Sequence, residues 1–273
     1  MQSRRPLQKY DHKYGRGVVA IIAGSKSYPG AALLTVGGAR RGGAGYIKFL
    51  NSHQSITDLV INQFPDVAPI SSIANMKLDA IVVGPGATTL RKIPEEIPIV
   101  LDSGALSLAR QRKLLKSDTK QLVVVTPHEG ELAQLGFSVP TGNSSVSARL
   151  KARVEVAQRV ADELHVICVL KGHKTVVAIP RSALYDSVKP RQPKKSSHHI
   201  DAVGGSELAT AGTGDILAGL IGAFLASWKP QDHCEALDVI SAAVNLHSRA
   251  GKHAALHKRS VVATDILESL AHC

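Results

Sequence analysis

Short apolar runs rich in β-branched residues alternate along this chain with stretches of helical spacing, and this alternation constrains the fold more than any other feature. Most of the runs are apolar at every position, as strands are that are buried on both faces of a sheet. We predict strands at residues 18–23, 46–50, 81–83, 97–101, 122–126, 166–170 and 175–179. We predict helices between them, including residues 30–41, 106–116, 130–135 and 146–164. Such alternation predicts an α/β fold in which helices cover a mainly parallel sheet.

The length and composition fit a single domain. A chain of 273 residues can bury a complete core in one large α/β domain, which we place at residues 1–273. Aromatic residues make up only 4% of the chain, so alanine, valine and leucine must fill that core.

The alternation stops after residue 179. Pro180, Pro190 and Pro193 interrupt it, and we expect a long, basic, exposed loop at about residues 186–200. Helices are then predicted in succession at residues 215–228, 235–250 and 260–270, with Gly251 as the C-cap of the second.

The net charge of +11 calls for an anionic partner or a basic solvated surface. Nucleic acid is one such partner, but the chain has few aromatic side chains on which bases would stack. We therefore favour a solvated surface or the attraction of phosphate over nucleic-acid binding.

The cysteines and the N-terminus indicate a cytoplasmic protein. Cys168, Cys234 and Cys273 are widely spaced without a metal-ligand pattern, which is typical of a reducing compartment. Cys168 lies in an apolar run and is expected to be a small buried hydrophobe. No apolar segment near the basic N-terminus is long enough for a signal peptide or a membrane span, so we expect no membrane partner.

The strongest local signal is residues 208–219, where small residues and glycines lead directly into an apolar helix. Glycines let the backbone approach a phosphate, and the free N–H groups at a helix start bind its oxygens. Asp215 falls in the first turn, where a carboxylate beside phosphate is useful if it accepts a proton from an attacking hydroxyl. The alternative is a helix-capping aspartate in a tight loop. Neither a P-loop nor a GxGxxG motif is present, so any phosphate is held in another way.

The segment Gly212-Thr213-Gly214-Asp215 resembles the anion-hole and base signature of ribokinase-like enzymes. That resemblance implies a three-layer α/β/α sandwich that binds ATP or ADP. Asp215 would be the catalytic base, and Gly212, Thr213 and Gly214 would form the anion hole.

Further segments resemble one branch of that superfamily, the ADP/ATP-dependent NAD(P)H-hydrate dehydratases. In chain order they are Gly24-Ser25 through Tyr28-Pro29-Gly30-Ala31-Ala32, Arg41-Gly42-Gly43-Ala44-Gly45, Val83-Gly84-Pro85-Gly86, Leu101-Asp102-Ser103-Gly104-Ala105-Leu106, Thr126-Pro127-His128-Glu129-Gly130-Glu131 and Leu170-Lys171-Gly172-His173-Lys174-Thr175. Each is weak alone, and their common order makes the set specific. Gly84, Asp102, His128 and Lys171 all follow predicted strands, so these loops should converge on one crevice at the sheet edge.

The resemblance implies repair of the S form of NAD(P)H-hydrate to NAD(P)H, with ADP or ATP as co-substrate and Mg²⁺ as cofactor. The hydrate would contact Ala32, Gly84, Gly86, His128 and Asp215. The nucleotide would contact Lys171, Gly172, His173, Lys174, Thr175 and Gly214. The resemblance assigns no particular residue as a metal ligand. A homo-oligomer is expected, and because only 17 residues precede Val18, an NAD(P)H-hydrate epimerase is expected to be a separate protein.

The chain departs from the family pattern at two places. Gly104 stands where family members usually carry a second carboxylate, which puts substrate or metal handling there in question, and Gly204-Gly205-Ser206-Glu207 replaces an Asn-Pro-Gly-Met-like run. A small-molecule kinase of the same fold, a nucleic-acid-binding protein and a member that binds nucleotide without turnover therefore remain as alternatives.

Overall fold

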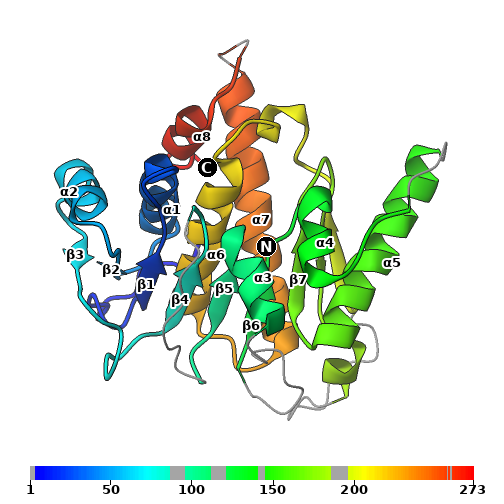
Figure 1. Cartoon of the computed structure of the whole chain (residues 1–273), viewed down its shortest axis with the longest axis horizontal. Coiled ribbons are helices and arrows are strands. Elements are labelled where there is room, and N and C mark those ends of the chain that lie inside the picture. Colours follow the sequence, from blue (N-terminus) through cyan, green and yellow to red (C-terminus); the bar gives the residue numbers. More distant parts are fainter. Residues whose placement is uncertain are drawn as a thin grey trace.

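A central sheet of nine strands organises the part of the chain that the computed structural model describes, namely residues 4–86, 96–111, 121–140, 145–185, 196–256, 258 and 260–273 (Figure 1). The strand order is β3-β2-β1-β4-β5-β6-β7-β8-β9. The strands are β1 (Val18–Ile22), β2 (Tyr46–Phe49), β3 (Ala68–Pro69), β4 (Ala80–Val83), β5 (Ile99–Leu101), β6 (Val123–Val125), β7 (Ile167–Leu170), β8 (Thr175–Ala178) and β9 (His198–Asp201).

Pairing is parallel from β3 through β7, and it is antiparallel between β7 and β8 and between β8 and β9. The chain leaves β1 toward β2 and β3, then returns to place β4 on the other side of β1. The carboxyl ends of β1 and β4 therefore flank a topological switch point, where open α/β sheets bind ligands.

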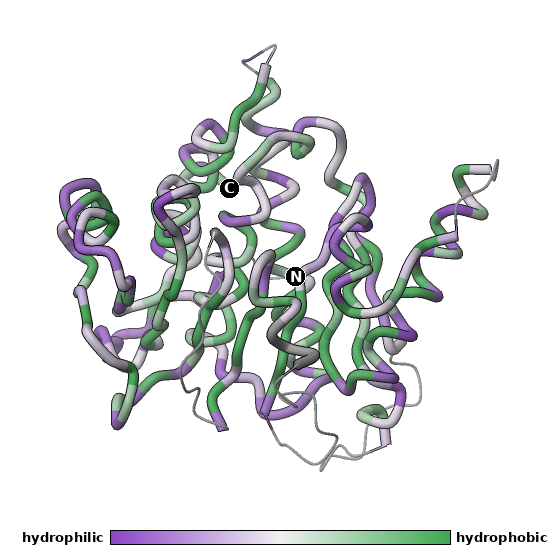
Figure 2. The backbone as a smooth tube through the Cα atoms, in the orientation of Figure 1, coloured by the Kyte–Doolittle hydropathy of each residue, from purple (hydrophilic) through white to green (hydrophobic). Residues whose placement is uncertain are grey.

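The two faces of the sheet bury separate hydrophobic clusters, because successive strand side chains point to opposite faces. Val19 and Ile21 of β1 belong to one cluster, and Val18 and Ala20 belong to the other. Figure 2 shows the strands as the hydrophobic centre of the fold. The first face is covered by α1 (Pro29–Arg41), α2 (Gln54–Gln63), α6 (Thr213–Trp228), α7 (His233–Ala255) and α8 (Ala263–Ser269). The second is covered by α4 (Leu132–Leu135), α5 (Val146–Leu164) and the start of α3 (Gly104–Gln111). The result is the expected three-layer α/β/α sandwich.

Helices α1 and α6 pack at backbone distance through glycines. A Cβ on Gly38 would overlap the carbonyl oxygen of Ile216, and a Cβ on Gly219 would overlap that of Thr35. The helix that carries Asp215 is therefore held directly against the helix that follows β1.

The predicted strands all form, with ends that differ by one or two residues. The helix at 146–164 begins and ends where predicted, whereas the segment at 130–135 divides into a 3₁₀ turn at Glu129–Glu131 and a short α4. Cys168 is fully buried, as expected.

One prediction in the second half was wrong, and another is tested only at its end. Gly251 is no C-cap, because α7 continues through it to Ala255. The glycine is needed there for packing, since a Cβ would meet Leu208 Cδ2 at 2.6 Å. The predicted basic loop at 186–200 lies outside the described residues from 186 to 195, and its end at His198–Asp201 is the edge strand β9.

No helix within the described residues is long and apolar enough to cross a membrane.

Candidate active site

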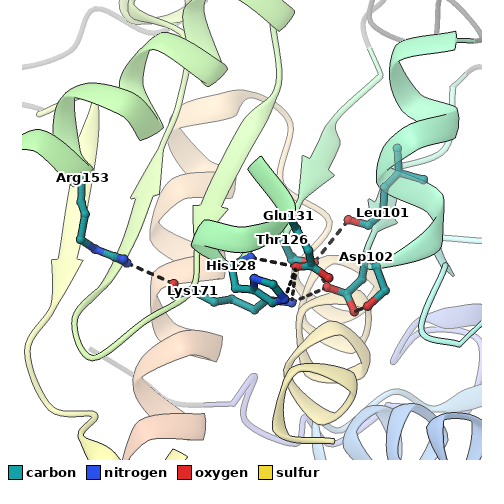
Figure 3. Close-up of polar contacts among 8 residues, drawn as sticks. Leu101, Asp102, Thr126, His128, Glu131, Arg153 and Lys171 are labelled. Carbon is teal, nitrogen blue, oxygen red and sulfur yellow. Dashed lines mark hydrogen bonds and ion pairs between the residues drawn. The ribbon is translucent and has the colours of Figure 1, made fainter. Parts of the chain in front are cut away.

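Polar side chains from the ends of three neighbouring strands, two of them charged, meet at one point of the sheet edge (Figure 3). Asp102 follows β5, Thr126 follows β6, and Lys171 follows β7. Lys171 Nζ lies 2.7 Å from Asp102 Oδ1, and Thr126 Oγ1 donates to the same oxygen at 2.5 Å. The prediction that the loops after these strands converge is thus confirmed for Asp102 and Lys171.

Glu131 completes this cluster from the 3₁₀ turn. Its carboxylate accepts a hydrogen bond from the backbone N–H of His128 at 2.8 Å and lies 3.6 Å from Lys171 Nζ. His128 itself forms an isolated parallel bridge with Lys171, so the ends of β6 and β7 stay in register beyond the strands. Glu131 therefore joins the turn to the lysine.

Lys171 remains an ammonium group in this setting. Burial alone lowers the pKa of Lys171, but the charges of Asp102, Glu131 and Asp215 and the hydrogen bond to Asp102 raise it overall. Its Nζ lies near Gly214, where an added Cβ would come within 3.2 Å of it. The positive charge of Lys171 therefore lies close to the start of α6.

The start of α6 has the form of an anion site. Gly212 is the N-cap with φ 92°, a left-handed conformation that favours glycine, and Asp215 lies in the first turn. Thr213 Oγ1 donates to the carbonyls of Leu208 and Thr210, which fixes the loop before the helix. The free N–H groups of this first turn are available to an anion.

The carboxyl group of Asp215 has an unusual acidity. Burial, together with the charges of Asp102 and Glu131, raises its pKa to about 7 against the opposing charge of Lys171. A carboxylate with a pKa near the working pH is suited to accepting a proton from a hydroxyl.

Three of the predicted hydrate-binding residues, Ala32, Gly84 and Gly86, lie beside the carboxyl ends of β1 and β4. A Cβ on Gly84 (φ 118°) would overlap the backbone carbonyl of Asp102, so Gly84 packs against the charged cluster. Gly86 (φ 63°) lies against Ala31 and Tyr28. The backbone N–H of Gly24, after β1, donates to Pro85 O at 2.7 Å and ties the two loops together. Together they form a glycine-lined wall beside the switch point.

Not every predicted contact residue reaches the surface of this wall. Ala32 is fully buried beneath Gly24, so its side chain supports the wall from below. His128 is not part of this wall, because it lies beyond β6, two strands from β4, and 58% of its side chain is exposed.

A cavity of about 360 Å³ opens on the other side of the α6 start. Most of the predicted nucleotide-binding residues line it, with Lys174 the exception. The lining residues are Lys171, Gly172, His173, Thr175, Gly205, Ser206, Leu208, Ala209, Thr213, Gly214, Leu217 and His247.

Arg153 of α5 holds the loop on one side of this cavity. Its buried guanidinium donates to the carbonyls of Leu170, Lys171 and Lys174, and it pairs with Glu129. Lys174 therefore contributes a carbonyl to the support of the loop. Sequence reasoning missed Arg153, because nothing local distinguishes a buried arginine from the solvated arginines of the same helix.

The described residues contain no group of three or more His, Cys, Asp or Glu side chains arranged to hold a metal ion. Asp102 and Glu131 both face the ammonium of Lys171, and Gly104 supplies no side chain. A Mg²⁺ held by protein side chains alone does not fit this arrangement.

The sandwich, the anion site at the start of α6 and the carboxylate in its first turn define a ribokinase-like protein. A family model of NAD(P)H-hydrate dehydratase matches residues 19–272, and the chain belongs to this family.

Individual relatives agree with that assignment. The chain is 32% identical over 235 residues to the bifunctional NAD(P)H-hydrate repair enzyme Nnr of Mycobacterium tuberculosis, covering 83% of this chain and 44% of that protein. It is 30% identical to the ADP-dependent (S)-NAD(P)H-hydrate dehydratase of Bacillus subtilis, covering 77% of this chain and 72% of that protein. It thus spans less than half the length of the bifunctional relatives.

A solved structure is also similar. The ADP/ATP-dependent NAD(P)H-hydrate dehydratase of Bacillus subtilis, co-crystallized with ATP/Mg²⁺, superimposes with a TM-score of 0.75 at 25% identity. The match covers 98% of this chain and 92% of that one.

Proposed function

We propose that this protein is a hydro-lyase that returns the S form of NAD(P)H-hydrate to NAD(P)H, with ADP or ATP as co-substrate. The observation that carries the proposal is the position of Asp215, a carboxylate with a pKa of about 7 between a glycine-lined wall and a cavity beside an anion site. Membership in the dehydratase family supports it.

In this proposal the glycine wall and the cavity take different substrates. Gly84, Gly86 and His128 bind the hydrated nicotinamide, with Ala32 beneath them, and Asp215 faces its hydroxyl. The nucleotide occupies the cavity with its terminal phosphate at the start of α6. The phosphate oxygens accept hydrogen bonds from the N–H groups of Gly212, Thr213 and Gly214 and from the ammonium of Lys171.

Asp215 accepts the proton of the ring hydroxyl as that oxygen attacks the terminal phosphorus. The new P–O bond forms while the bond to the rest of the nucleotide breaks, and the departing nucleotide keeps that electron pair. The ring C–O bond then breaks, with the ring nitrogen supplying electrons and the phosphate leaving with the bonding pair. Loss of a proton from the adjacent ring carbon restores the reduced nicotinamide. Phosphorylation is needed because hydroxide is a poor leaving group.

Mg²⁺ would accompany the nucleotide as a ligand of its phosphates, where it would neutralise charge, because such sites use few protein carboxylates. On the protein side, Lys171 and the first-turn amides perform the same electrostatic task.

The wider setting follows from the reaction. A protein that takes only the S form works beside an NAD(P)H-hydrate epimerase, which we propose as a functional partner. The buried thiols of Cys168 and Cys234 are consistent with a reducing, cytoplasmic location, and a homo-oligomer stays a prediction.

The test is to incubate the purified protein with (S)-NADH-hydrate and either ADP or ATP. We expect recovery of the absorbance of reduced nicotinamide together with release of phosphate. Asp215→Asn should lower turnover by roughly 10²–10⁴-fold while nucleotide affinity changes little, because only the proton acceptor is removed. A stable phosphorylated product would identify a kinase instead, and full activity in Asp215→Asn would rule out Asp215 as the base.

A further inference from the structure

The loop at residues 171–174, between β7 and β8, forms one side of the proposed nucleotide cavity. Its members that line the cavity are Lys171, Gly172 and His173. The antiparallel ladder of the two strands ends at the pair of Leu170 and Val176, so the backbone of the loop lies beyond that ladder. The shape of this side of the cavity therefore depends on contacts that the loop makes outside the sheet.

Arg153 of α5 supplies such contacts from behind the loop (Figure 3). Its side chain is buried, and Nη2 donates to the carbonyls of Leu170, Lys171 and Lys174 at 3.1, 3.1 and 3.3 Å. A Cβ on Gly172 would come within 2.6 Å of Nη2, so the loop backbone packs directly on the guanidinium. Arg153 does not line the cavity itself, so it acts on an occupant only through the loop.

One carboxylate balances the charge of this guanidinium. Nη1 of Arg153 pairs with Glu129 Oε1, and Glu129 Oε2 accepts a hydrogen bond from Arg149 at 2.6 Å. A buried arginine needs such a partner, because an unpaired charge away from water is costly. Arg149 lies one helical turn earlier and is 49% exposed, so it shares the carboxylate from the solvent side. Among the described contacts, Arg153 is the arginine of this pair that reaches the loop.

We propose that Arg153 is a positioning residue for the nucleotide, which holds the loop at residues 171–174 and the ammonium of Lys171 in the arrangement that receives the phosphates. The inference rests on the proposed function, because it takes the cavity as the nucleotide site. Lys171 is held at both ends, since its carbonyl accepts from Arg153 and its Nζ pairs with Asp102 at 2.7 Å. Without the guanidinium the nucleotide must order the loop when it binds, and this cost lowers its affinity.

Arg153→Lys tests this role. The substitution keeps a positive charge for Glu129 but removes the planar fork whose donors reach several carbonyls at once. ADP is titrated calorimetrically into the wild type and the variant without any hydrate, so the result does not depend on turnover. We expect the variant to bind ADP about tenfold more weakly, which corresponds to ordering the backbone of about one residue.

Steady-state constants separate positioning from a general loss of structure. Bound nucleotide holds the loop in place, so kcat at saturating ADP should stay within about threefold of the wild type while the KM for ADP rises about tenfold. The KM for the hydrate should change less than about twofold, because the glycine-lined wall lies beside β1 and β4. Arg149→Lys is the matched control. It alters the other partner of Glu129 and should leave all three constants within about twofold of the wild type.

Glu129→Gln keeps the proposal testable if circular dichroism shows that Arg153→Lys does not fold. Arg153 then keeps its carbonyl partners but loses its counter-charge, so ADP should bind about threefold more weakly. Wild-type affinity for ADP in this variant would overturn the proposal in that case.

The remaining outcomes are distinct. Wild-type affinity for ADP in a folded Arg153→Lys, or an equal loss of affinity in Arg149→Lys, would overturn the proposal about Arg153. So would a fall in kcat without a rise in the KM for ADP. A tenfold loss of affinity in a protein without dehydratase activity would support the positioning role and remove the proposed reaction. A wild type that does not bind ADP would overturn the nucleotide site and this inference with it.

Discussion

The chemistry of this site depends on a small number of charges that control one another. Asp102, Glu131 and Asp215 are acidic, and Lys171 is the cation among them. Lys171 pairs with Asp102 at 2.7 Å and lies 3.6 Å from Glu131, so its positive charge interacts with two carboxylates besides that of Asp215. Lys171 therefore only partly offsets the burial and the negative charges that raise the pKa of Asp215. The network therefore keeps one carboxylate ready to exchange a proton near pH 7.

The pH dependence of turnover should report this coupling. The proposed mechanism needs the base form of Asp215, so kcat/KM should fall on the acid side with an apparent pKa of about 7. Asp102→Asn removes a negative charge that raises the pKa of Asp215, so the acid limb should move to lower pH by roughly 0.5–1 unit. Profiles of kcat/KM against pH for the wild type and the variant measure this shift in the acid limb. Asp66→Asn, at a surface pair with Arg40, is the matched control and should leave the limb in place.

The same raised pKa has a consequence for stability. Between the ordinary pKa of 3.8 and the folded value of about 7, the folded protein binds more protons at Asp215 than the unfolded chain. Stability is therefore lost as the pH rises through this window, and the cost is complete above about pH 7.

Asp215→Asn should for this reason stabilise the protein at about pH 8 by roughly 1–3 kcal/mol, a value discounted for partial solvent exposure. The gain should shrink to a small fraction near pH 4, where the wild-type carboxyl group is protonated in the folded state and about half protonated in the unfolded state. Denaturant unfolding at both pH values provides the measurement. A gain of equal size at both would show that ionisation is not its cause.

At the scale of elements, the hydrophobic pattern predicted most of the fold and part of the site. Fully apolar runs identified β1 and β4 to β7, and polar residues after them identified Asp102, His128 and Lys171. The edge strand β9 escaped prediction because its sequence begins with His198 and His199 and has no apolar alternation.

What sequence reasoning missed depends on contacts between distant segments. His247 lies 76 positions after Lys171 and lines the same cavity, because α7 packs beside α6. Glycine is common at helix ends, but Gly251 lies inside α7, where a Cβ would come within 2.6 Å of Leu208 Cδ2. Arg153 reaches the loop at 171–174 from the middle of α5. No local pattern encodes such pairings.

The close packing of α1 and α6 leads to a prediction for Gly38. Ala at this position would force its Cβ against the carbonyl of Ile216, the residue after Asp215. Since that obstacle is backbone, the helices must separate, and we expect Gly38→Ala to cost roughly 3–5 kcal/mol of unfolding free energy. Turnover should also fall, about 100-fold for a displacement of Asp215 of about 1 Å.

Gly30→Ala in the same helix is the matched control, because its Cβ would meet nothing within 4 Å. It should be neutral or stabilising by about 0.5 kcal/mol. Comparable stability of the two variants in urea would contradict the backbone-contact argument.

At the scale of the whole molecule, the site connects the two hydrophobic cores. Lys171 follows a strand of the sheet, β7, whereas Asp215 lies in a helix on one face and Glu131 precedes a helix on the other. A nucleotide bound between them contacts elements of both layers, so its binding free energy should be added to the stability of the entire sandwich.

Thermal unfolding with ADP tests this connection. At a concentration of about 100 times its Kd, ADP should add about 2.7 kcal/mol. A domain of this size should then melt roughly 5–10 °C higher, in one transition seen equally by far-ultraviolet circular dichroism and by Trp228 fluorescence. Gly214→Ala, whose Cβ would come 3.2 Å from Lys171 Nζ, narrows the phosphate end and should show a smaller shift. Two separate transitions, of which ADP moves only one, would mean that the two faces of the sheet unfold independently and that the site stabilises only one of them.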